Sequence, residues 1–205
     1  MIIGPKYKIA RRLGAPIFEK TQTQKYALSQ ARKEKSGKSF SRPKSNFGMQ
    51  LLEKQKARFT YCVTEKQFAK YVKHALEKRT KGSNPVDDLY ASLELRADNV
   101  AFRAGFSATR LGARQLVSHG HMCVNGKRIT IPSMQLSVGD VISIRSGSSE
   151  KPLFASLSER LKAYTQPSWI KFDFDKREAE IAGNPKYDKG NSMFDMNAIL
   201  EFYSR

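Results

Sequence analysis

The stretch 105–145 constrains the fold of this 205-residue chain more than any other. Its first part has apolar residues at helical spacing and ends before Gly120. Its second part carries the dipeptide Asn125-Gly126 between two short apolar runs, followed by a further run over 141–144. Asn-Gly between such runs is the strongest local signal for a two-residue hairpin turn. The stretch therefore predicts a helix followed by a small antiparallel sheet.

The helix of this stretch is expected to present arginines to a partner. Ser107 or Thr109 can cap its first turn, and it should end near His119. Arg110 and Arg114 are four residues apart, so they should stand together on one helix surface. Guanidinium groups bind phosphates through two parallel hydrogen bonds, which lysine cannot make. The pattern indicates a phosphate-binding helix.

Charge indicates the chemistry of the partner. The chain has a net charge of +18 and a pI of about 10.0. Residues 1–92 hold 21 Lys and Arg against 7 Asp and Glu, residues 93–145 hold 7 against 3, and residues 146–205 hold 9 of each. Such a charge favours nucleic acid or an anionic membrane surface. We expect neither a membrane span nor a secretory leader, because no apolar run is long enough.

Enzymatic and metal chemistry are not expected. Cys62 and Cys123 cannot form a four-ligand zinc site alone, and we interpret them as buried thiols, although a disulfide between them stays open. His119 and His121 have no carboxylate nearby in sequence, which favours an RNA contact or a structural hydrogen bond over catalysis. The chain has no nucleophile–base set, phosphate-binding loop or dinucleotide fingerprint. We expect no cofactor.

The first half of the chain is expected to be helical and basic. Residues 4–14 are interpreted as a phosphate-binding arm, with a solvated basic tail as the alternative. Residues 20–46 have no hydrophobic period and are interpreted as a segment that orders on its partner. Helices are expected over 49–59 and from the capping box of Thr64 and Gln67 to Gly82.

The remaining elements follow from periodicity and turn signals. A helix is expected to run from Pro85 to Ala104, with Gly105 as its left-handed stop. Residues 146–149 are expected to form a flexible link and 155–164 a short helix. Strands are expected over 169–174 and 178–181, and the apolar end, 196–205, is expected to dock.

The central stretch resembles the small RNA-binding module named after bacterial small-subunit ribosomal protein S-four. The residues that carry the resemblance are Arg96, Asp98, Asn99, Val100, Gly105, Phe106, Thr109, Arg110, 113–117, 119–121, 124–126, 131–133, Gly139 and Asp140. The flanks are similar to the ribosomal protein itself at Gly4, Pro5, Lys6, Arg11, Arg12, Gly14, 47–48, 50–51, 53–56, Arg58, Tyr61, Val63, Glu65, 67–68, Tyr71, Pro167, Trp169 and 200–205. The resemblance covers nearly the whole chain.

This resemblance implies an α+β fold and a ribosomal function. A mostly helical N-terminal domain, 1–93, would be completed by 187–205, with a helix–turn–helix and small-sheet module with a β extension, 94–186, inserted. The family binds a helical junction in the 5′ domain of small-subunit rRNA and helps to nucleate subunit assembly. It lies near the mRNA entry beside the fifth small-subunit protein and affects decoding accuracy. The implied location is the ribosome of the cytoplasm.

Four positions depart from the usual family pattern: Phe47 replaces a tyrosine, Leu52 an arginine, Ala97 a leucine and Met134 a tyrosine. The lost arginine would remove one RNA contact, and Ala97 leaves a smaller core side chain. Some members hold zinc through an N-terminal cysteine cluster. This chain has no cysteine before Cys62, so we expect no zinc.

The predicted RNA-binding residues combine the basic segments with the matched module. They are Lys6, Lys8, Arg11, Arg12, Lys54, Lys56, Arg58, Arg96, Asn99, Arg103, Thr109, Arg110, Arg114, Gln115, His119, His121, Asn125, Lys127 and Arg128. Alternative functions are a stand-alone binder of structured RNA, an accessory of an RNA-modifying enzyme, and a helix–turn–helix DNA-binding repressor. The flanks leave no room for a catalytic domain of usual size, which disfavours the enzyme.

Overall fold

The computed structural model describes residues 3–35, 45–79, 82–162 and 164–204. The chain forms two compact units: one contains residues 1–86 and 188–205, and the other contains residues 87–187. The inserted module was expected to begin at residue 94, and the second unit begins earlier, at residue 87. Within the described residues no helix is long and apolar enough to cross a membrane.

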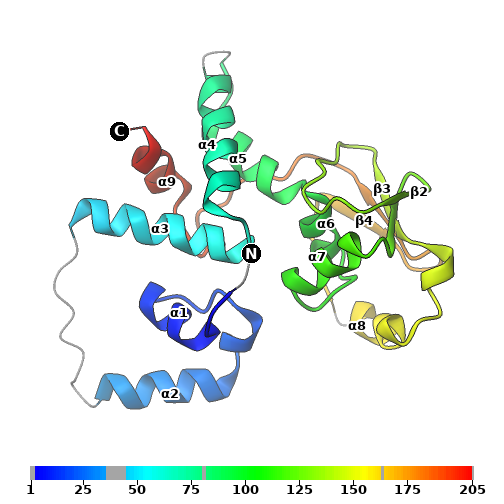
Figure 1. Ribbon diagram of the computed structural model, residues 1–205, viewed down its shortest axis with the longest axis horizontal. Helices are drawn as coiled ribbons and strands as arrows, with labels where there is room; N and C mark the ends of the chain where they lie inside the picture. Colours follow the sequence, from blue (N-terminus) through cyan, green and yellow to red (C-terminus); the bar gives the residue numbers. More distant parts are fainter. Residues whose placement is uncertain (1–2, 36–44, 80–81, 163, 205) are drawn as a thin grey trace. The chain divides into compact units, whose positions relative to one another are not determined.

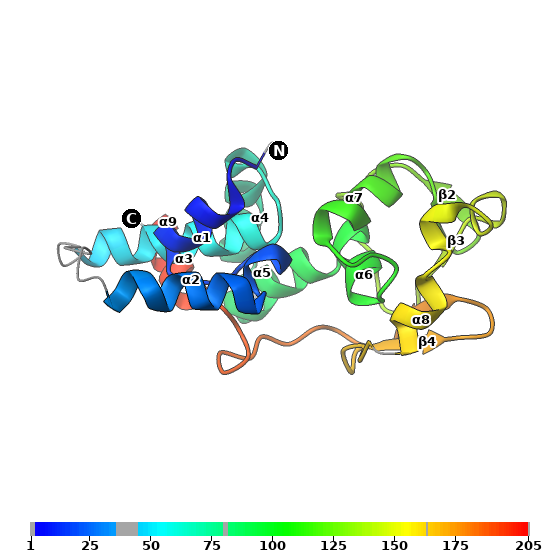
Figure 2. The same cartoon turned by 90° about the horizontal axis from the view of Figure 1, so that it is seen from below.

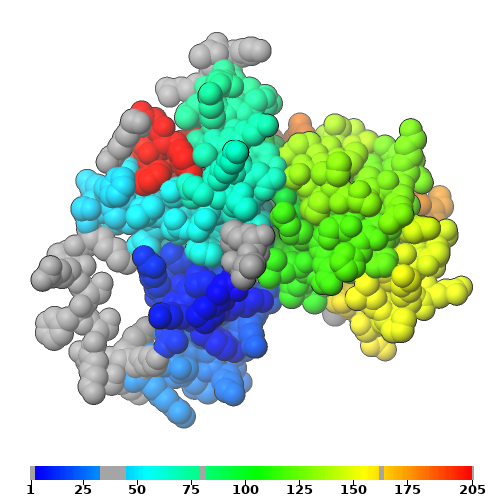
Figure 3. All heavy atoms as spheres, viewed as in Figure 1, coloured from blue at the N-terminus to red at the C-terminus, as the bar shows by residue number. Residues whose placement is uncertain are grey.

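The first unit is helical. Its elements are α1 (Lys6–Leu13), the 3-10 turn η1 (Glu19–Thr21), α2 (Gln24–Lys35), α3 (Asn46–Thr60), α4 (Glu65–Arg79) and α9 (Met196–Tyr203). The C-terminal helix α9 packs on α3 and α4, as the ribbon and the space-filling view show (Figures 1 and 3). The prediction that the C-terminal segment docks is confirmed.

Two segments of the first unit differ from the sequence-based expectation. The expected arm is a helix, α1, which buries Ala10 and Leu13 and exposes Lys8, Arg11 and Arg12. The segment expected to lack structure contains α2. The sequence of α2 shows no hydrophobic period because its apolar residues do not share one buried face: Tyr26 is buried, whereas Leu28 is exposed. Residues 36–44 of that predicted segment lie outside the described residues.

The second unit combines helices with a sheet. It contains α5 (Pro85–Glu94), α6 (Ala97–Arg103), α7 (Arg110–Ser118), β1 (Met122–Val124), β2 (Lys127–Ile129), β3 (Val141–Ile144), η2 (Ser146–Ser148), η3 (Pro152–Phe154), α8 (Leu157–Lys162), β4 (Ile170–Asp173) and β5 (Glu178–Ile181). In the described residues the sheet is five-stranded and antiparallel, in the order β2-β1-β3-β5-β4. The α+β class and the Asn125-Gly126 hairpin are confirmed.

The helix expected from Pro85 to Ala104 is broken, because its middle pairs with another segment. Arg96 adopts an extended conformation (φ −68°, ψ 138°) and forms an isolated β-bridge with Gln135. Beside it, the amide of Leu136 donates to the carbonyl of Leu95 at 2.9 Å. These contacts replace helical hydrogen bonds and separate α5 from α6.

The core of the second unit lies between the helices and the sheet. Val100 of α6, Val117 of α7 and Ile142 of β3 are completely buried in it, and α8 contributes Leu157. Helices α6 and α7 lie side by side in both views (Figures 1 and 2). The expected flexible link at 146–149 instead forms η2, in which Ser148 is buried, so that prediction is wrong.

Candidate nucleic-acid interface

Helix α7 begins where the sequence predicts. Thr109 is its N-cap, and the Thr109 Oγ1 atom accepts a hydrogen bond from the amide of Gly112 at 3.0 Å. A side chain at Gly112 would collide with the hydroxyl of Ser107, so glycine keeps this first turn compact. The cap uses the Thr109 hydroxyl as an acceptor and fixes the direction in which Arg110 and Arg114 leave the helix.

Arg110 is held in place by α6. Its Nε atom donates to Asn99 Oδ1 at 2.9 Å, and its guanidinium lies 4.4 Å from the centre of the Phe102 ring. The contact with the ring and this hydrogen bond hold the guanidinium in one orientation. Arg110 is therefore oriented before any partner binds.

Arg114 and Arg96 share one carboxylate. Arg114 Nη1 lies 3.3 Å from Asp98 Oδ2, and the Arg114 side chain keeps 28% of its surface exposed. Arg96 binds the same Asp98 through two bonds, Nε to Oδ1 at 3.0 Å and Nη2 to Oδ2 at 2.8 Å. The Arg96 side chain is 0% exposed. Because a fully buried guanidinium cannot reach a phosphate, the predicted direct contact by Arg96 is corrected to a structural role.

A second buried carboxylate, that of Glu94, binds two further side chains of α6. Arg103 binds it through Nε at 2.8 Å and Nη2 at 2.6 Å, while Asn99 Nδ2 donates to Glu94 Oε2 at 2.6 Å. Burial, followed by the nearby Glu94 charge, raises the pKa of Tyr90 to about 12. Asn99 is buried between Glu94 and Arg110, so its predicted RNA contact is also corrected to a structural role.

The β1–β2 hairpin presents two further cations. Asn125 has φ 49° at the turn, and its side-chain amide donates to Asp140 Oδ1 at 2.8 Å while its Oδ1 accepts from the amide of Val141. Asn125 thus fastens the turn to the start of β3. Lys127 and Arg128 follow it and are exposed. They remain available for a polyanion.

Two histidines lie where α7 meets β1. The His119 and His121 ring centres are 6.1 Å apart, and His121 Nδ1 lies 3.0 Å from Ser148 Oγ. Burial lowers the pKa of His121, and the nearby cations of Lys151, Arg128 and Arg145 lower it further, so the ring is neutral at pH 7. In the described part of the chain no group of three potential ligands could hold a metal ion.

Arg145 and Lys151 were missed as candidate contacts. Both are exposed, and both act electrostatically on His121. The pairing of Met122 with Ile144 places Arg145 directly beside His121. Strand register could have revealed Arg145. Lys151 lies between the turns η2 and η3, which the sequence does not predict.

The N-terminal cations of the first unit lie on α1. Lys8, Arg11 and Arg12 are exposed, and Lys6 lies 5.8 Å from the centre of the Phe18 ring. Arg11 Nε donates to the carbonyl of Tyr7 at 3.1 Å. A helix that buries its apolar face and exposes these cations provides a basic ridge.

The α3 cations behave differently from one another. Lys54 is buried, its Nζ atom lies 2.8 Å from Glu65 Oε1, and it sits 4.4 Å from the Phe202 ring centre of α9. Its predicted RNA contact is therefore corrected, since its charge is already used to hold α9. Lys56 pairs with Glu53 at 2.7 Å, and Arg58 stacks on Phe59; both stay partly exposed.

Glu65 receives two donors from separate parts of the first unit. Lys54 Nζ and Tyr203 Oη both bind Glu65 Oε1, at 2.8 and 2.7 Å. Burial alone would raise the pKa of Glu65, but these hydrogen bonds outweigh it and lower the pKa below its usual value. The same contact raises the pKa of Tyr203, after the larger effect of burial. The cluster joins α3, α4 and α9.

The surviving candidate residues are exposed or partly exposed and fall on both units. They are Lys6, Lys8, Arg11, Arg12, Lys56 and Arg58 on the first unit, and Arg103, Thr109, Arg110, Arg114, Gln115, His119, His121, Asn125, Lys127 and Arg128 on the second. A basic helical unit joined in one chain to a module with a capped, arginine-bearing helix defines a nucleic-acid-binding protein.

Comparison with known proteins narrows this class. The sequence model of the "Ribosomal protein S4/S9 N-terminal domain" matches residues 1–94, and that of the "S4 domain" matches residues 95–142. The "Small ribosomal subunit protein uS4" of Akkermansia muciniphila is 39% identical over 210 residues, which cover 98% of each chain. Those of Chlorobium limicola and Polaromonas naphthalenivorans are 38% and 37% identical, with 98% or more of each chain covered.

The chain belongs to the ribosomal protein S4 family, and it carries that family's RNA-binding S4 domain. The family consists of structural proteins of the small ribosomal subunit rather than enzymes.

Proposed function

We propose that this protein binds a helical junction in the 5′ domain of small-subunit rRNA, and that this binding helps to nucleate assembly of the subunit. The observation that carries the proposal is the set of cations on α7 and the β1–β2 hairpin, of which those on α7 are pre-oriented. Asn99 and Phe102 hold Arg110, and Asp98 holds Arg114, which lowers the entropic cost of binding.

Duplex RNA is recognised through shape, phosphates and 2′-hydroxyls rather than through a groove code. A junction brings several such backbones together. The exposed cations of α1 add a second basic surface, on the other unit of the chain. Two basic surfaces favour a partner with several phosphate backbones over a single duplex.

Two finer elements of the proposal follow from the family. The protein would act in the cytoplasmic ribosome, near the mRNA entry and beside the fifth small-subunit protein, and would contribute there to decoding accuracy. Similarity over 98% of the chain to proteins named as small-subunit components supports this over a stand-alone RNA binder or an enzyme accessory.

Footprinting tests the proposal. The 5′ domain of small-subunit rRNA, transcribed in vitro, is probed with and without the protein. We expect protection to concentrate at one junction, and affinity to fall with salt with a log–log slope of about −0.7 to −0.9 for each neutralised phosphate. Protection scattered along the RNA, or equal affinity for a DNA duplex, would contradict the proposal.

A further inference from the structure

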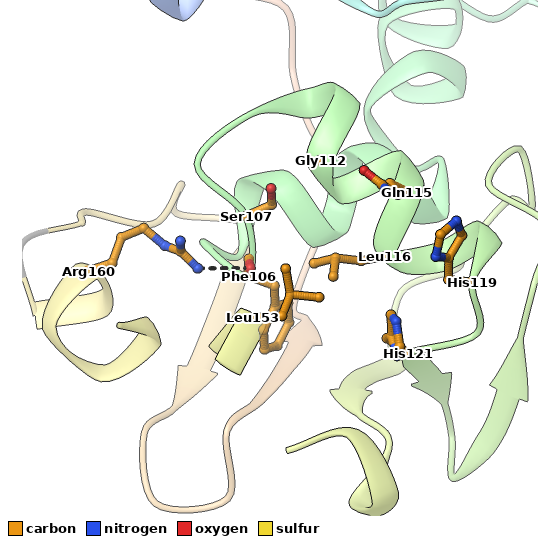
Figure 4. A pocket seen from close by; sticks show the side chains of 9 residues that line it. All are labelled: Phe106, Ser107, Gly112, Gln115, Leu116, His119, His121, Leu153 and Arg160. Carbon is orange, nitrogen blue, oxygen red and sulfur yellow. Dashed lines mark hydrogen bonds between the residues drawn. The ribbon is translucent and has the colours of Figure 1, made fainter. Parts of the chain in front are cut away.

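A small cavity opens beside the histidines of the second unit. It has a volume of about 140 Å³ and lies where α7, β1, η3 and α8 approach one another (Figure 4). Its apolar walls are Phe106 and Leu116, which are buried, and Leu153, which is 55% exposed at the mouth. Pockets for drug-sized ligands have about 300 to 1,000 Å³, so this cavity suits a single ring system.

Polar groups converge on this cavity from three sides. Gln115 and His119 lie along its α7 side, His121 comes from the residue directly before β1, and Arg160 comes from α8 (Figure 4). Arg160 Nη2 donates to the carbonyl of Phe106 at 2.9 Å. The Nε atom of Arg160 is buried and has no hydrogen-bond partner in the described part of the structure. An unsatisfied buried donor is costly, and it shows that the Arg160 guanidinium is not fully hydrogen-bonded within the described structure.

Among the described residues that line the cavity there is no carboxylate. His121 is neutral at pH 7, since burial and the surrounding cations lower its pKa, and it offers a ring edge rather than a charge. The nearby cations Arg128, Arg145 and Lys151 lie outside the cavity lining. An apolar slot with amide, imidazole and guanidinium groups, set among external cations, matches a nucleobase whose phosphates stay outside.

We propose that this cavity binds one unpaired base of the RNA, turned out of its stack and packed against Phe106, Leu116 and Leu153. The inference rests on the proposed RNA-binding function and deepens it, because it adds a contact to a base where that function requires only contacts to shape and phosphate. Unpaired bases that can be splayed out are the usual targets of sequence-selective RNA recognition. Arg160 and Gln115 would supply donors to the base edge, and Gln115 also an acceptor.

The test uses the full-length chain and the in vitro transcribed 5′ domain of small-subunit rRNA. Leu153→Ser removes an exposed wall of the cavity, and Val138→Ser is the matched control, since Val138 is 50% exposed on the same unit and does not line the cavity. Fluorescence of Trp169, the single tryptophan, verifies that both variants fold. Arg160→Lys, which keeps the charge but removes the forked donors, is the second cavity variant.

We expect Leu153→Ser to weaken RNA binding about fivefold, the lower end of the loss of one base-stacking partner, and Val138→Ser to leave it unchanged. The salt slope should not change, because no phosphate contact is lost. Base-specific chemical probing should show one unpaired nucleotide that the wild type protects and that both cavity variants leave reactive.

Three results would overturn the inference. Wild-type affinity and protection in both cavity variants would show that no base occupies the cavity, while leaving the proposed function intact. Unchanged RNA binding with loss of a neighbouring subunit protein would show that the occupant is a protein. If the wild type itself does not protect a junction, the proposed function fails first, and the inference fails with it.

Discussion

Arg103 forms a two-bond ion pair with the completely buried carboxylate of Glu94, at 2.8 Å through Nε and at 2.6 Å through Nη2. Removing one partner of a buried pair leaves an uncompensated charge. We expect Arg103→Ala to lower the free energy of unfolding of the second unit by about 3 kcal/mol. Trp169 packs against the core of that unit, so its fluorescence in urea measures the change.

The control for this prediction is Arg145→Ala, which removes an exposed arginine of the same unit. Its effect should stay within about 0.5 kcal/mol, as is usual for surface substitutions. The double variant Glu94→Gln/Arg103→Ala should recover part of the loss, because the buried charge is gone. An Arg103→Ala variant as stable as Arg145→Ala would show that Glu94 does not depend on its partner.

Lys127 and Arg96 should separate RNA binding from folding. Lys127 is exposed beyond the hairpin turn, so Lys127→Gln should reduce the log–log salt slope of RNA affinity by about 0.7 to 0.9, with little change in stability. Arg96→Gln should instead lower the stability of the second unit by more than about 2 kcal/mol, because Asp98 loses its two-bond partner. The salt slope of the folded Arg96→Gln protein should equal that of the wild type. A loss of stability in Lys127→Gln, or a reduced salt slope in folded Arg96→Gln, would refute the assignment of Lys127 to RNA binding and of Arg96 to the fold.

Gly120 and Gly139 offer a matched pair of left-handed positions. Both have positive φ, 70° and 92°, so alanine at either should cost about 1 kcal/mol of backbone strain. A side chain at Gly120 would also collide with the guanidinium of Arg128, whereas the space at Gly139 is open. We expect both variants to lose similar stability, but only Gly120→Ala to weaken RNA binding. Equal RNA affinity for the two would show that the position of Arg128 does not matter.

The pKa of Glu65 makes the first unit sensitive to acid. Because its hydrogen bonds outweigh burial and lower the folded pKa below the unfolded value, the carboxylate stabilises the fold above the unfolded pKa. This contribution is lost as pH falls through the folded pKa. Glu65→Gln should therefore be less stable at pH 7, by roughly 1 kcal/mol after screening of this part-exposed group, and this difference should shrink as pH falls through the folded pKa of Glu65. Circular dichroism of the helices in urea provides the measurement, and a difference that persists in acid would contradict the cause.

Local signals predicted the second unit well. The Asn125-Gly126 turn set the register of β1 and β2, and the Thr109 hydroxyl marked the start of α7, because both depend on residues adjacent in sequence. The role of Arg96 could not be predicted in the same way. Its burial depends on Asp98 and on a bridge to Gln135, and the second contact is formed only when a distant segment folds back.

In the first unit, local sequence signals did not predict helix α2 or the role of Lys54. Among the residues of α2 whose burial is described, Tyr26 alone is buried, and it stacks on Tyr7 of α1 with ring centres 5.6 Å apart. A single anchor produces no hydrophobic period, so no window of the sequence signals this helix. Lys54 was misassigned for a related reason, since its partner Glu65 and the rings of α9 come from separate elements.

The placement of α9 on α3 and α4 has a consequence for biogenesis. Synthesis proceeds from the N-terminus, so residues 87–187, which form the second unit, leave the translating ribosome before the last helix of the first unit. The hydrogen bond from Tyr203 to Glu65 can therefore form only after the whole second unit has been synthesised. Completion of the first unit thus requires synthesis of the chain through α9, and a chain truncated before α9 would expose the surface of α3 and α4 that α9 covers.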